Sequence, residues 1–189
     1  MSSSFNEINK VTTIIIYLIG KPGTGKYTIA QEIAKTGYSI CDNQHINNPI
    51  FSLLNYDGLT PIPEFAWDAI GRIRDSIFNF LSQEIANNYV LTNCLYEVEG
   101  DRKLFNQVQQ LAINRRSVFI PVKLLISQEE NIKRIQQLDR LLRYKSIDVQ
   151  DVYPEYPLIQ ISHPNLFEFD VTNLSASESA RRILQHINN

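Results

Sequence analysis

Cysteine is scarce in this sequence, and its two cysteines are far apart. Cys41 and Cys94 stand at the ends of apolar runs, without the paired spacing of a zinc site or a redox motif. Their number and spacing exclude a disulfide scaffold and a structural zinc site of the common kinds. Cysteines in such a setting are usually small buried side chains, so we expect two free thiols.

The sequence also lacks an excess of either charge and any long hydrophobic run. Its 18 basic and 20 acidic side chains give a net charge of −2, and basic and aromatic residues are not interleaved. This balance argues against nucleic acid and anionic membranes as partners. No apolar run approaches the length that spans a bilayer, and the first residues do not resemble a secretory signal. We therefore expect a cytoplasmic protein.

What the sequence does contain is a hydrophobic content of 43%, enough for one buried core in a chain of 189 residues. We expect a polar lead-in over residues 1–11 and a single domain over residues 12–189. Apolar segments alternate with helical patterns, which is typical of an α/β fold with a parallel sheet covered on both faces. The expected strands lie near residues 13–19, 38–42, 89–94, 121–126 and 166–171.

Helices are predicted by their apolar spacing and by their end signals. The first runs from about residue 25 to 36 and stops at Gly37, which can take a left-handed C-cap conformation. A longer helix is expected from about residue 64 to 88. Capping-box patterns at Ser127 and Ser175 predict two further helix starts.

Prolines interrupt the regular pattern in the second half of the sequence. Pro121 cannot donate to a sheet hydrogen bond, so we expect it as the first residue of its strand. Residues 144–165 contain three prolines and have no clear period. We expect an irregular segment there.

Glycine is also sparse, but three of the seven glycines fall within Gly20-Lys-Pro-Gly23-Thr-Gly25-Lys26, between the first strand and the first helix. The spacing G-x-x-x-x-G-K indicates a phosphate-binding loop, whose backbone N–H groups surround a polyphosphate at the positive end of a helix. A solvated lysine is the alternative for Lys26, which the coincidence of strand, glycines and helix disfavours. Nucleotide binding is therefore predicted for Gly20, Gly23, Thr24, Gly25, Lys26, Tyr27 and Thr28.

Tyr27 departs from the common form of this loop, in which a Ser or Thr hydroxyl directly after the lysine ligates Mg²⁺. The loop resembles the G-x-P-G-x-G-K-G-T loop of the adenylate kinase family, which also lacks that hydroxyl and holds its metal largely through water. We expect Tyr27 to cover the helix against a neighbouring element rather than to ligate the metal through its phenol.

The resemblance points to the P-loop branch that contains nucleoside monophosphate kinases, shikimate and gluconate kinases and chloramphenicol phosphotransferase. It implies a three-layer α/β/α P-loop fold, a five-stranded parallel sheet of order 2-3-1-4-5 and a small lid segment over about residues 134–165. It also implies ATP and Mg²⁺ as cofactors. Thr28 is the candidate metal ligand, through water.

Asp42 is expected at the carboxyl end of the second strand, the edge where ligands bind in open α/β sheets. A carboxylate there can orient an acceptor hydroxyl and take its proton late in phosphoryl transfer. Small-molecule kinases that resemble this chain often have an aspartate there. The alternative is that Asp42 caps the turn into residues 47–49. His45, in the same polar run, is a candidate substrate ligand or a solvent-facing side chain.

The third strand ends in Thr92 and Asn93, where many P-loop enzymes have an aspartate that holds the metal shell. Asn93 can orient water or substrate, or it can serve only in hydrogen bonding at the strand end. The metal-positioning carboxylate is then absent or comes from elsewhere, with Glu97 and Glu99 nearby.

Several cations lie where related kinases have their lid. Arg140 is the candidate catalytic arginine, and Arg134 and Arg143 are candidates for nucleotide binding, since arginines stabilise the phosphoryl group in flight. Solvated helix surface is the alternative for all three. Arg72 and Arg74, on the long helix, are candidates for contact with an anionic acceptor.

Together these patterns predict an ATP-dependent small-molecule kinase with a nucleoside triphosphate and a hydroxyl-bearing acceptor as partners. One alternative is a nucleoside monophosphate kinase, which would need a pair such as Arg72 and Arg74 at the acceptor pocket. Another is a nucleotide-binding regulatory protein without transfer activity, suggested by Tyr27 and by the missing carboxylate. The sequence leaves the acceptor, the base preference and the oligomeric state open.

Overall fold

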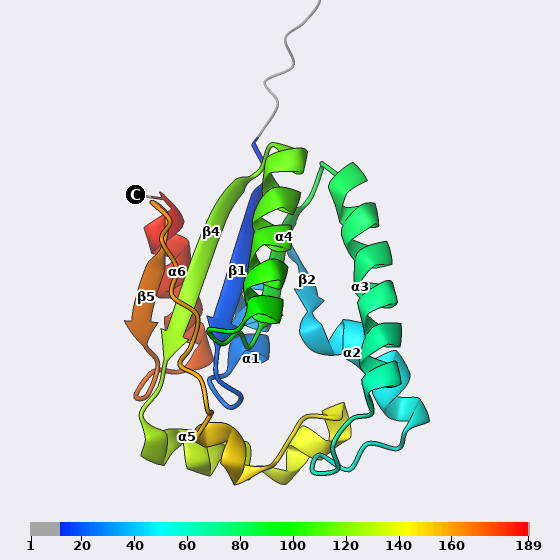
Figure 1. Ribbon diagram of the computed structural model, residues 1–189. Helices are drawn as coiled ribbons and strands as arrows, with labels where there is room; N and C mark the ends of the chain where they lie inside the picture. The colour runs from blue at the N-terminus through cyan, green and yellow to red at the C-terminus, as the bar shows by residue number, and fades with distance from the viewer. Residues whose placement is uncertain (1–11, 189) are drawn as a thin grey trace, which may run out of the picture.

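The computed structural model describes residues 12–188, so the lead-in expected over residues 1–11 lies outside the described residues. Five strands form one parallel sheet in the order β2-β3-β1-β4-β5, which confirms the expected order (Figure 1). The strands are β1 (Ile14–Gly20), β2 (Tyr38–Asp42), β3 (Asn88–Asn93), β4 (Val118–Leu125) and β5 (Phe167–Asp170).

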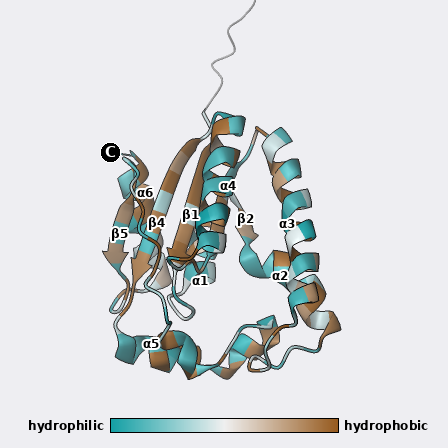
Figure 2. Ribbon diagram, viewed as in Figure 1, coloured by the Kyte–Doolittle hydropathy of each residue, from teal (hydrophilic) through white to brown (hydrophobic). Residues whose placement is uncertain are grey.

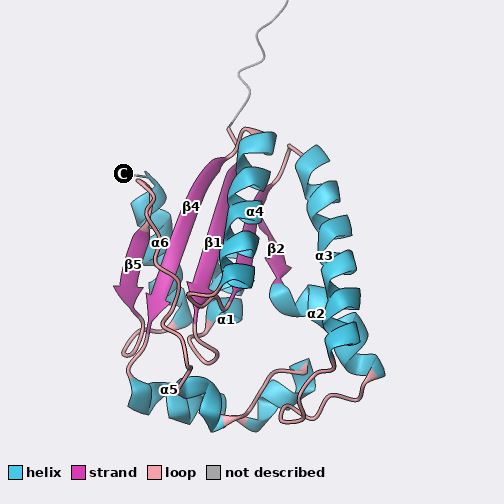
Figure 3. Ribbon diagram, viewed as in Figure 1, coloured by secondary structure: helices cyan, strands magenta, loops and turns pink. Residues whose placement is uncertain are grey.

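Helices cover both faces of this sheet. On one face lie α1 (Lys26–Ala34) and α6 (Ala176–Asn188), and on the other lie α3 (Glu64–Gln83) and α4 (Glu99–Arg115) (Figure 3). The remaining helices are α2 (Asn43–Leu53), α5 (Gln128–Ile135) and the short 3-10 helices η1 (Leu138–Arg143) and η2 (Val149–Val152). The expected three-layer α/β/α architecture is therefore confirmed.

The central strand β1 shows why both faces are covered. Ile15, Tyr17 and Ile19 pack against α3 and α4, whereas Ile16 and Leu18 pack against α1 and α6. All five side chains are fully buried. A strand that alternates between two apolar faces must be covered on both, and Figure 2 shows the hydrophobic strands enclosed between helices whose outer sides are largely hydrophilic.

The predicted helix ends are largely confirmed. The Ser127 hydroxyl accepts a hydrogen bond from the Glu130 N–H at 3.3 Å, and the Ser175 hydroxyl accepts one from the Glu178 N–H at 3.1 Å. Gly37 follows α1 with a φ of 99°, a left-handed conformation that glycine adopts readily. These local signals are confirmed because they depend only on neighbouring residues.

The position of Pro121 within its strand was predicted wrongly. Strand β4 begins at Val118, so Pro121 is an internal residue paired with Tyr17. The Val118 N–H donates to the Thr13 carbonyl on the β1 side, and N–H groups alternate along a strand, so the Pro121 nitrogen faces the β5 side. Pairing with β5 begins only at Val122, and Pro121 therefore removes no sheet hydrogen bond.

The end of the long helix was also predicted wrongly. Helix α3 ends at Gln83 rather than near Asn88, which belongs to β3. The Glu84 carboxylate accepts a hydrogen bond from the Ala86 N–H at 2.9 Å and holds a turn there. The buried Arg115 guanidinium donates to the Leu81 and Asn87 carbonyls, which satisfies the end of the helix from outside.

The carboxyl ends of the strands meet at one edge of the sheet (Figure 1). Gly20 lies beside Leu124, and Asp42 lies beside Thr92. Residues 136–166 are here called the α5–β5 segment. Their first part lies along this edge, and their last part runs back to the start of β5 (Figure 1). They contain only the two short 3-10 helices and an isolated bridge, which confirms the irregular structure predicted for residues 144–165. Among the described residues, no helix combines the length and apolar character that crossing a bilayer requires.

Candidate nucleotide and acceptor site

The glycine-rich loop connects β1 to α1 and requires glycine at two positions. Gly23 has a φ of 87° and Gly25 a φ of 83°, both in the left-handed region that disfavours a side chain. A Cβ atom at Gly23 would also collide with the side-chain amide of Asn131. The chain can therefore turn tightly enough to direct its N–H groups into one concavity.

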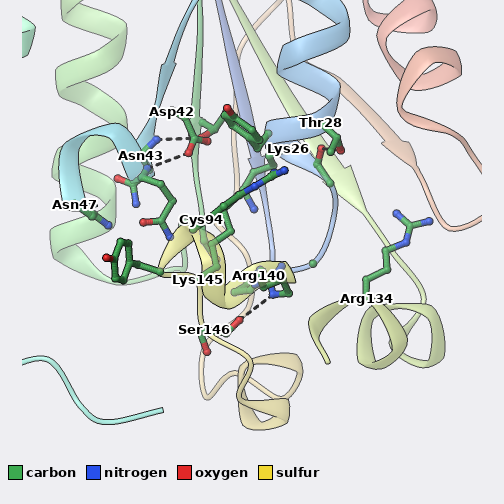
Figure 4. A pocket seen from close by; sticks show the side chains of 18 of the residues that line it. Lys26, Thr28, Asp42, Asn43, Asn47, Cys94, Arg134, Arg140, Lys145 and Ser146 are labelled. Atoms are coloured by element: carbon green, nitrogen blue, oxygen red, sulfur yellow. Dashed lines mark hydrogen bonds between the residues drawn. The ribbon is translucent and has the colours of Figure 1, made fainter. Parts of the chain in front are cut away.

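Lys26 lies across this loop. Its Nζ atom donates hydrogen bonds to the Gly20 carbonyl at 2.7 Å and the Lys21 carbonyl at 2.8 Å. Burial lowers the pKa of Lys26 from 10.5 to about 8, because the charged ammonium is separated from water. An anion in the loop would restore favourable charge contacts, and Figure 4 shows the Lys26 side chain extending into the site.

The loop is also held by residues that the sequence did not single out. Asn131 of α5 is buried, and its Nδ2 atom donates to the Pro22 carbonyl at 2.6 Å. Lys21 Nζ donates to the Val152 carbonyl of η2 at 3.1 Å. The helical spacing could have identified Asn131, because it lies one turn before the buried Ile135, at a position where an apolar residue is expected.

A cavity of about 540 Å³ lies between the loop, the ends of β2 and β3, α2 and the α5–β5 segment. It brings together most of the predicted site residues, which come from segments far apart in the sequence. Those that line it are Gly23, Gly25, Lys26, Tyr27, Thr28, Asp42, Asn93, Arg134, Arg140 and Arg143. Gly20 and Thr24 belong to the loop without lining the cavity, and Thr24 is buried with its hydroxyl on the Lys21 carbonyl.

Asp42 caps a helix rather than the expected turn, because residues 47–49 lie within α2. Its carboxylate accepts a hydrogen bond from the Thr92 hydroxyl and another from the Gln44 N–H at 3.1 Å, so it caps the start of α2. The same side chain is buried and lines the cavity (Figure 4). Capping fixes the carboxylate in place, which suits a group that must meet a hydroxyl in one orientation.

Asn93 belongs to a hydrogen-bond network at the end of β3. Its Oδ1 atom accepts from the Tyr17 hydroxyl at 3.0 Å, and its Nδ2 atom donates to the Asn43 side chain at 2.9 Å. Both ends of the amide are thus engaged in joining strands to α2. These bonds agree with the interpretation that Asn93 serves in hydrogen bonding at the strand end, and they hold Asn43 in the cavity wall.

The two nearby glutamates do not reach this cavity. Glu97 pairs with Arg102 at 2.6 Å and Glu99 with Lys103 at 2.7 Å, both at the surface. Over residues 12–188, no group of three His, Cys, Asp or Glu side chains could hold a metal ion. This donor set fits Mg²⁺ only in its usual nucleotide-bound form, with few protein ligands and several waters. Asp42 and Thr28, whose hydroxyl donates to the Gly25 carbonyl at 2.8 Å, supply the available oxygens.

Three predicted cations reach the cavity from α5 and the α5–β5 segment. Arg134 pairs with Glu130 at 2.7 Å and donates to the Thr172 carbonyl at 3.0 Å. Arg140 donates to the Ser146 carbonyl at 2.9 Å, and burial lowers its pKa. In Figure 4, Arg140 lies beside Ser146, and Arg134 lies apart from it on the side of Thr28.

Tyr27 carries a contact that the sequence did not predict in detail. The Arg143 guanidinium lies 5.1 Å and the Lys145 ammonium 4.8 Å from the centre of its ring, at cation–π distance. The His45 ring meets it edge-on at 6.1 Å. Tyr27 thus joins the start of α1 to the α5–β5 segment, and His45 is exposed and does not line the cavity.

The two arginines of α3 also lie outside the cavity. Arg72 is exposed. Burial raises the pKa values of Asp101 and Tyr17, and the nearby charge of Arg74 opposes that rise. Neither arginine lines the cavity. The arginine pair that an acceptor phosphate would require is therefore not assembled by these residues.

Comparisons with known proteins agree with this geometry at the level of the fold. No protein-family model matches the sequence, and no curated protein matches it in a sequence comparison. Among solved structures, a Chloroflexus aurantiacus protein whose kinase assignment is provisional is 17% identical, with a TM-score of 0.64 and coverage of 94% of this chain and 97% of that one.

Two further structures have the same fold and a named activity. A gluconokinase from Sinorhizobium meliloti is 16% identical, with a TM-score of 0.58 and coverage of 93% of this chain and 91% of its own. The APS kinase of Mycobacterium tuberculosis, in complex with AMPPNP and APS, is 12% identical, with a TM-score of 0.55 and coverage of 94% and 99%. The chain therefore has the fold of the P-loop small-molecule kinases.

Proposed function

We propose that this protein is an ATP-dependent phosphotransferase that acts on a hydroxyl group of a small molecule. The observation that carries the proposal is the pairing of Lys26 and Asp42 in one cavity, the first on a phosphate-binding loop and the second at the end of β2. A loop alone would support nucleotide binding. A fixed carboxylate across the cavity adds a group that can receive a proton.

In this proposal the loop N–H groups and Lys26 hold the β- and γ-phosphates, and the arginines of the α5–β5 segment meet the transferring group. The acceptor oxygen forms a bond to the γ-phosphorus while the bond to the β–γ bridging oxygen breaks, which leaves ADP. The hydroxyl proton passes to the Asp42 carboxylate. Mg²⁺ on the nucleotide, with the Thr28 hydroxyl as its candidate protein oxygen through water, would neutralise phosphate charge. ATP and Mg²⁺ are abundant in the cytoplasm, where we place this activity.

Two substitutions test the separate halves of the site. Lys26→Ala should abolish ATP binding, because no other side chain of the loop offers a charge at that point. Asp42→Asn should keep ATP binding and the α2 cap, since Asn caps helices as well as Asp does, while phosphoryl transfer falls by about 10²–10⁴-fold. Asp75→Asn, on the exposed face of α3, is the matched control and should change neither.

The assay follows transfer of radiolabelled γ-phosphate from ATP to a panel of hydroxyl acceptors and to water, with nucleotide affinity measured in parallel. Asp42→Asn with the transfer rate of the wild type would contradict the role of Asp42. Tight ATP binding that depends on Lys26, without transfer to any acceptor or to water, would instead support a nucleotide-binding regulatory protein.

A further inference from the structure

The walls of the cavity differ in charge on its two sides. The cations that line it come from the loop, α5 and the α5–β5 segment, and they are Lys26, Arg134, Arg140, Arg143 and Lys145. The lining residues contributed by α2, by α3 and by the chain between them include no lysine or arginine. A bound triphosphate would therefore occupy the cationic side and leave the α2–α3 side for the acceptor.

The cations on the loop side are already engaged there. Arg143 and Lys145 lie against the Tyr27 ring, and Arg134 is tied to Glu130 and to the chain after β5. In Figure 4, Asn43 and Asn47 lie on the opposite side of the view from Thr28 and Arg134. An acceptor on the α2 side would thus meet these two amides.

Two amide side chains on this side have an enclosed oxygen without a partner. The Gln44 Oε1 and Asn47 Oδ1 atoms are buried and accept no hydrogen bond from the described residues, although both side chains line the cavity. Each of these amides also carries two N–H donors, and a hydroxyl oxygen of the acceptor can accept from them.

The rest of this wall is aromatic. Phe51 is buried and packs against the Trp67 ring edge-on at 5.7 Å and against the Tyr56 ring at 4.9 Å. All three line the cavity, and Trp67 is 44% exposed. A partly open indole beside a buried phenyl ring offers an apolar surface on which a ring of the ligand can stack.

From these observations we infer that the acceptor is a hydroxyl compound that carries an aromatic or apolar ring, which stacks on the aromatic side chains of this wall. The inference rests on the proposed function for the identity of the reaction. It concerns the α2–α3 side of the cavity, which is here called the acceptor wall and consists of Gln44, Asn47, Phe51, Tyr56 and Trp67.

Matched probes test the inference by binding, independently of turnover. Isothermal titration of the full chain saturated with AMPPNP and Mg²⁺ would compare phenyl β-D-glucoside with methyl β-D-glucoside, which lacks the phenyl ring. We expect phenyl β-D-glucoside to bind at least about tenfold more tightly, equivalent to about 1.4 kcal/mol.

Two variants locate the effect on the acceptor wall. Trp67→Ala should weaken phenyl β-D-glucoside binding by about tenfold without changing the affinity for AMPPNP. Phe65→Ala removes an aromatic side chain that lies on the same helix turn, is 69% exposed and does not line the cavity, so both affinities should stay as in the wild type.

The inference is overturned if methyl β-D-glucoside binds as tightly as phenyl β-D-glucoside, if neither probe binds, or if Trp67→Ala leaves probe binding unchanged. Failure of the proposed function gives a different result. In that case AMPPNP and phenyl β-D-glucoside bind as expected, but no labelled phosphate moves from ATP to a probe.

Discussion

The lowered pKa of Lys26 predicts that ATP affinity falls at alkaline pH. In the nucleotide-free protein burial brings this pKa to about 8, so half of the Lys26 side chains are neutral at that pH. Bound phosphates favour the charged form and raise the pKa again. Between pH 7 and pH 9 the affinity for MgATP should therefore fall by about tenfold, because at pH 9 most molecules must first take up a proton.

Isothermal titration of MgATP in buffers of different ionisation enthalpy measures both quantities. Near pH 9 each bound ATP should take up about one proton, whereas near pH 7 the uptake should be small. Lys26→Arg is the control, since arginine stays charged over this range and should flatten the pH dependence. It also separates Lys26 from Lys145, whose pKa burial lowers as well.

The same shift has a consequence for stability with the opposite sign. Between about pH 8 and 10.5 the unfolded chain holds a proton on Lys26 that the folded protein has lost. The free energy of unfolding of the nucleotide-free protein should therefore rise with pH across this window. The reasoning is refuted if wild-type affinity for MgATP stays constant from pH 7 to 9, or if Lys26→Arg retains the full dependence.

Two further predictions concern the loop and its contact with the α5–β5 segment. Gly23→Ala should lower the melting temperature and remove the ATP-dependent thermal shift, because it places a Cβ at a φ of 87° and against Asn131. Gly71→Ala is the control: it lies in open space within α3 and should stabilise the protein by about 0.5–1 kcal/mol. Equal ATP-dependent thermal shifts in both variants would contradict this prediction. Tyr27→Ala should lower the free energy of unfolding by about 0.5–1 kcal/mol for each cation that contacts the ring, and it should speed amide hydrogen exchange around Arg143. Tyr27→Phe keeps the ring and should change neither quantity. Unchanged exchange in Tyr27→Ala would show that the ring does not hold the segment.

The features that the sequence predicted well are those written in neighbouring residues. The loop from Gly20 to Lys26, the capping serines and the left-handed Gly37 each depend on a few adjacent positions. Alternating apolar residues in β1 likewise indicated a strand buried on both faces. The sheet order came from the resemblance, and the structure confirms it.

The features that the sequence could not predict depend on contacts between distant segments. Pro121 is tolerated inside β4 because β5 begins to pair only one residue later. The end of α3 depends on Arg115, more than thirty positions beyond Leu81. The acceptor wall is likewise assembled from side chains of α2, α3 and the chain between them, whose shared surface has no signature in the spacing of residues.

The aromatic ring of Tyr27 bears on how the α5–β5 segment tolerates its own positive charge. Two cations held close together repel one another unless a group of opposite polarity lies beside them. The electron-rich face of the ring attracts both Arg143 and Lys145 and so offsets part of this repulsion. The residue that departs from the usual loop pattern therefore helps to keep the segment against the start of α1.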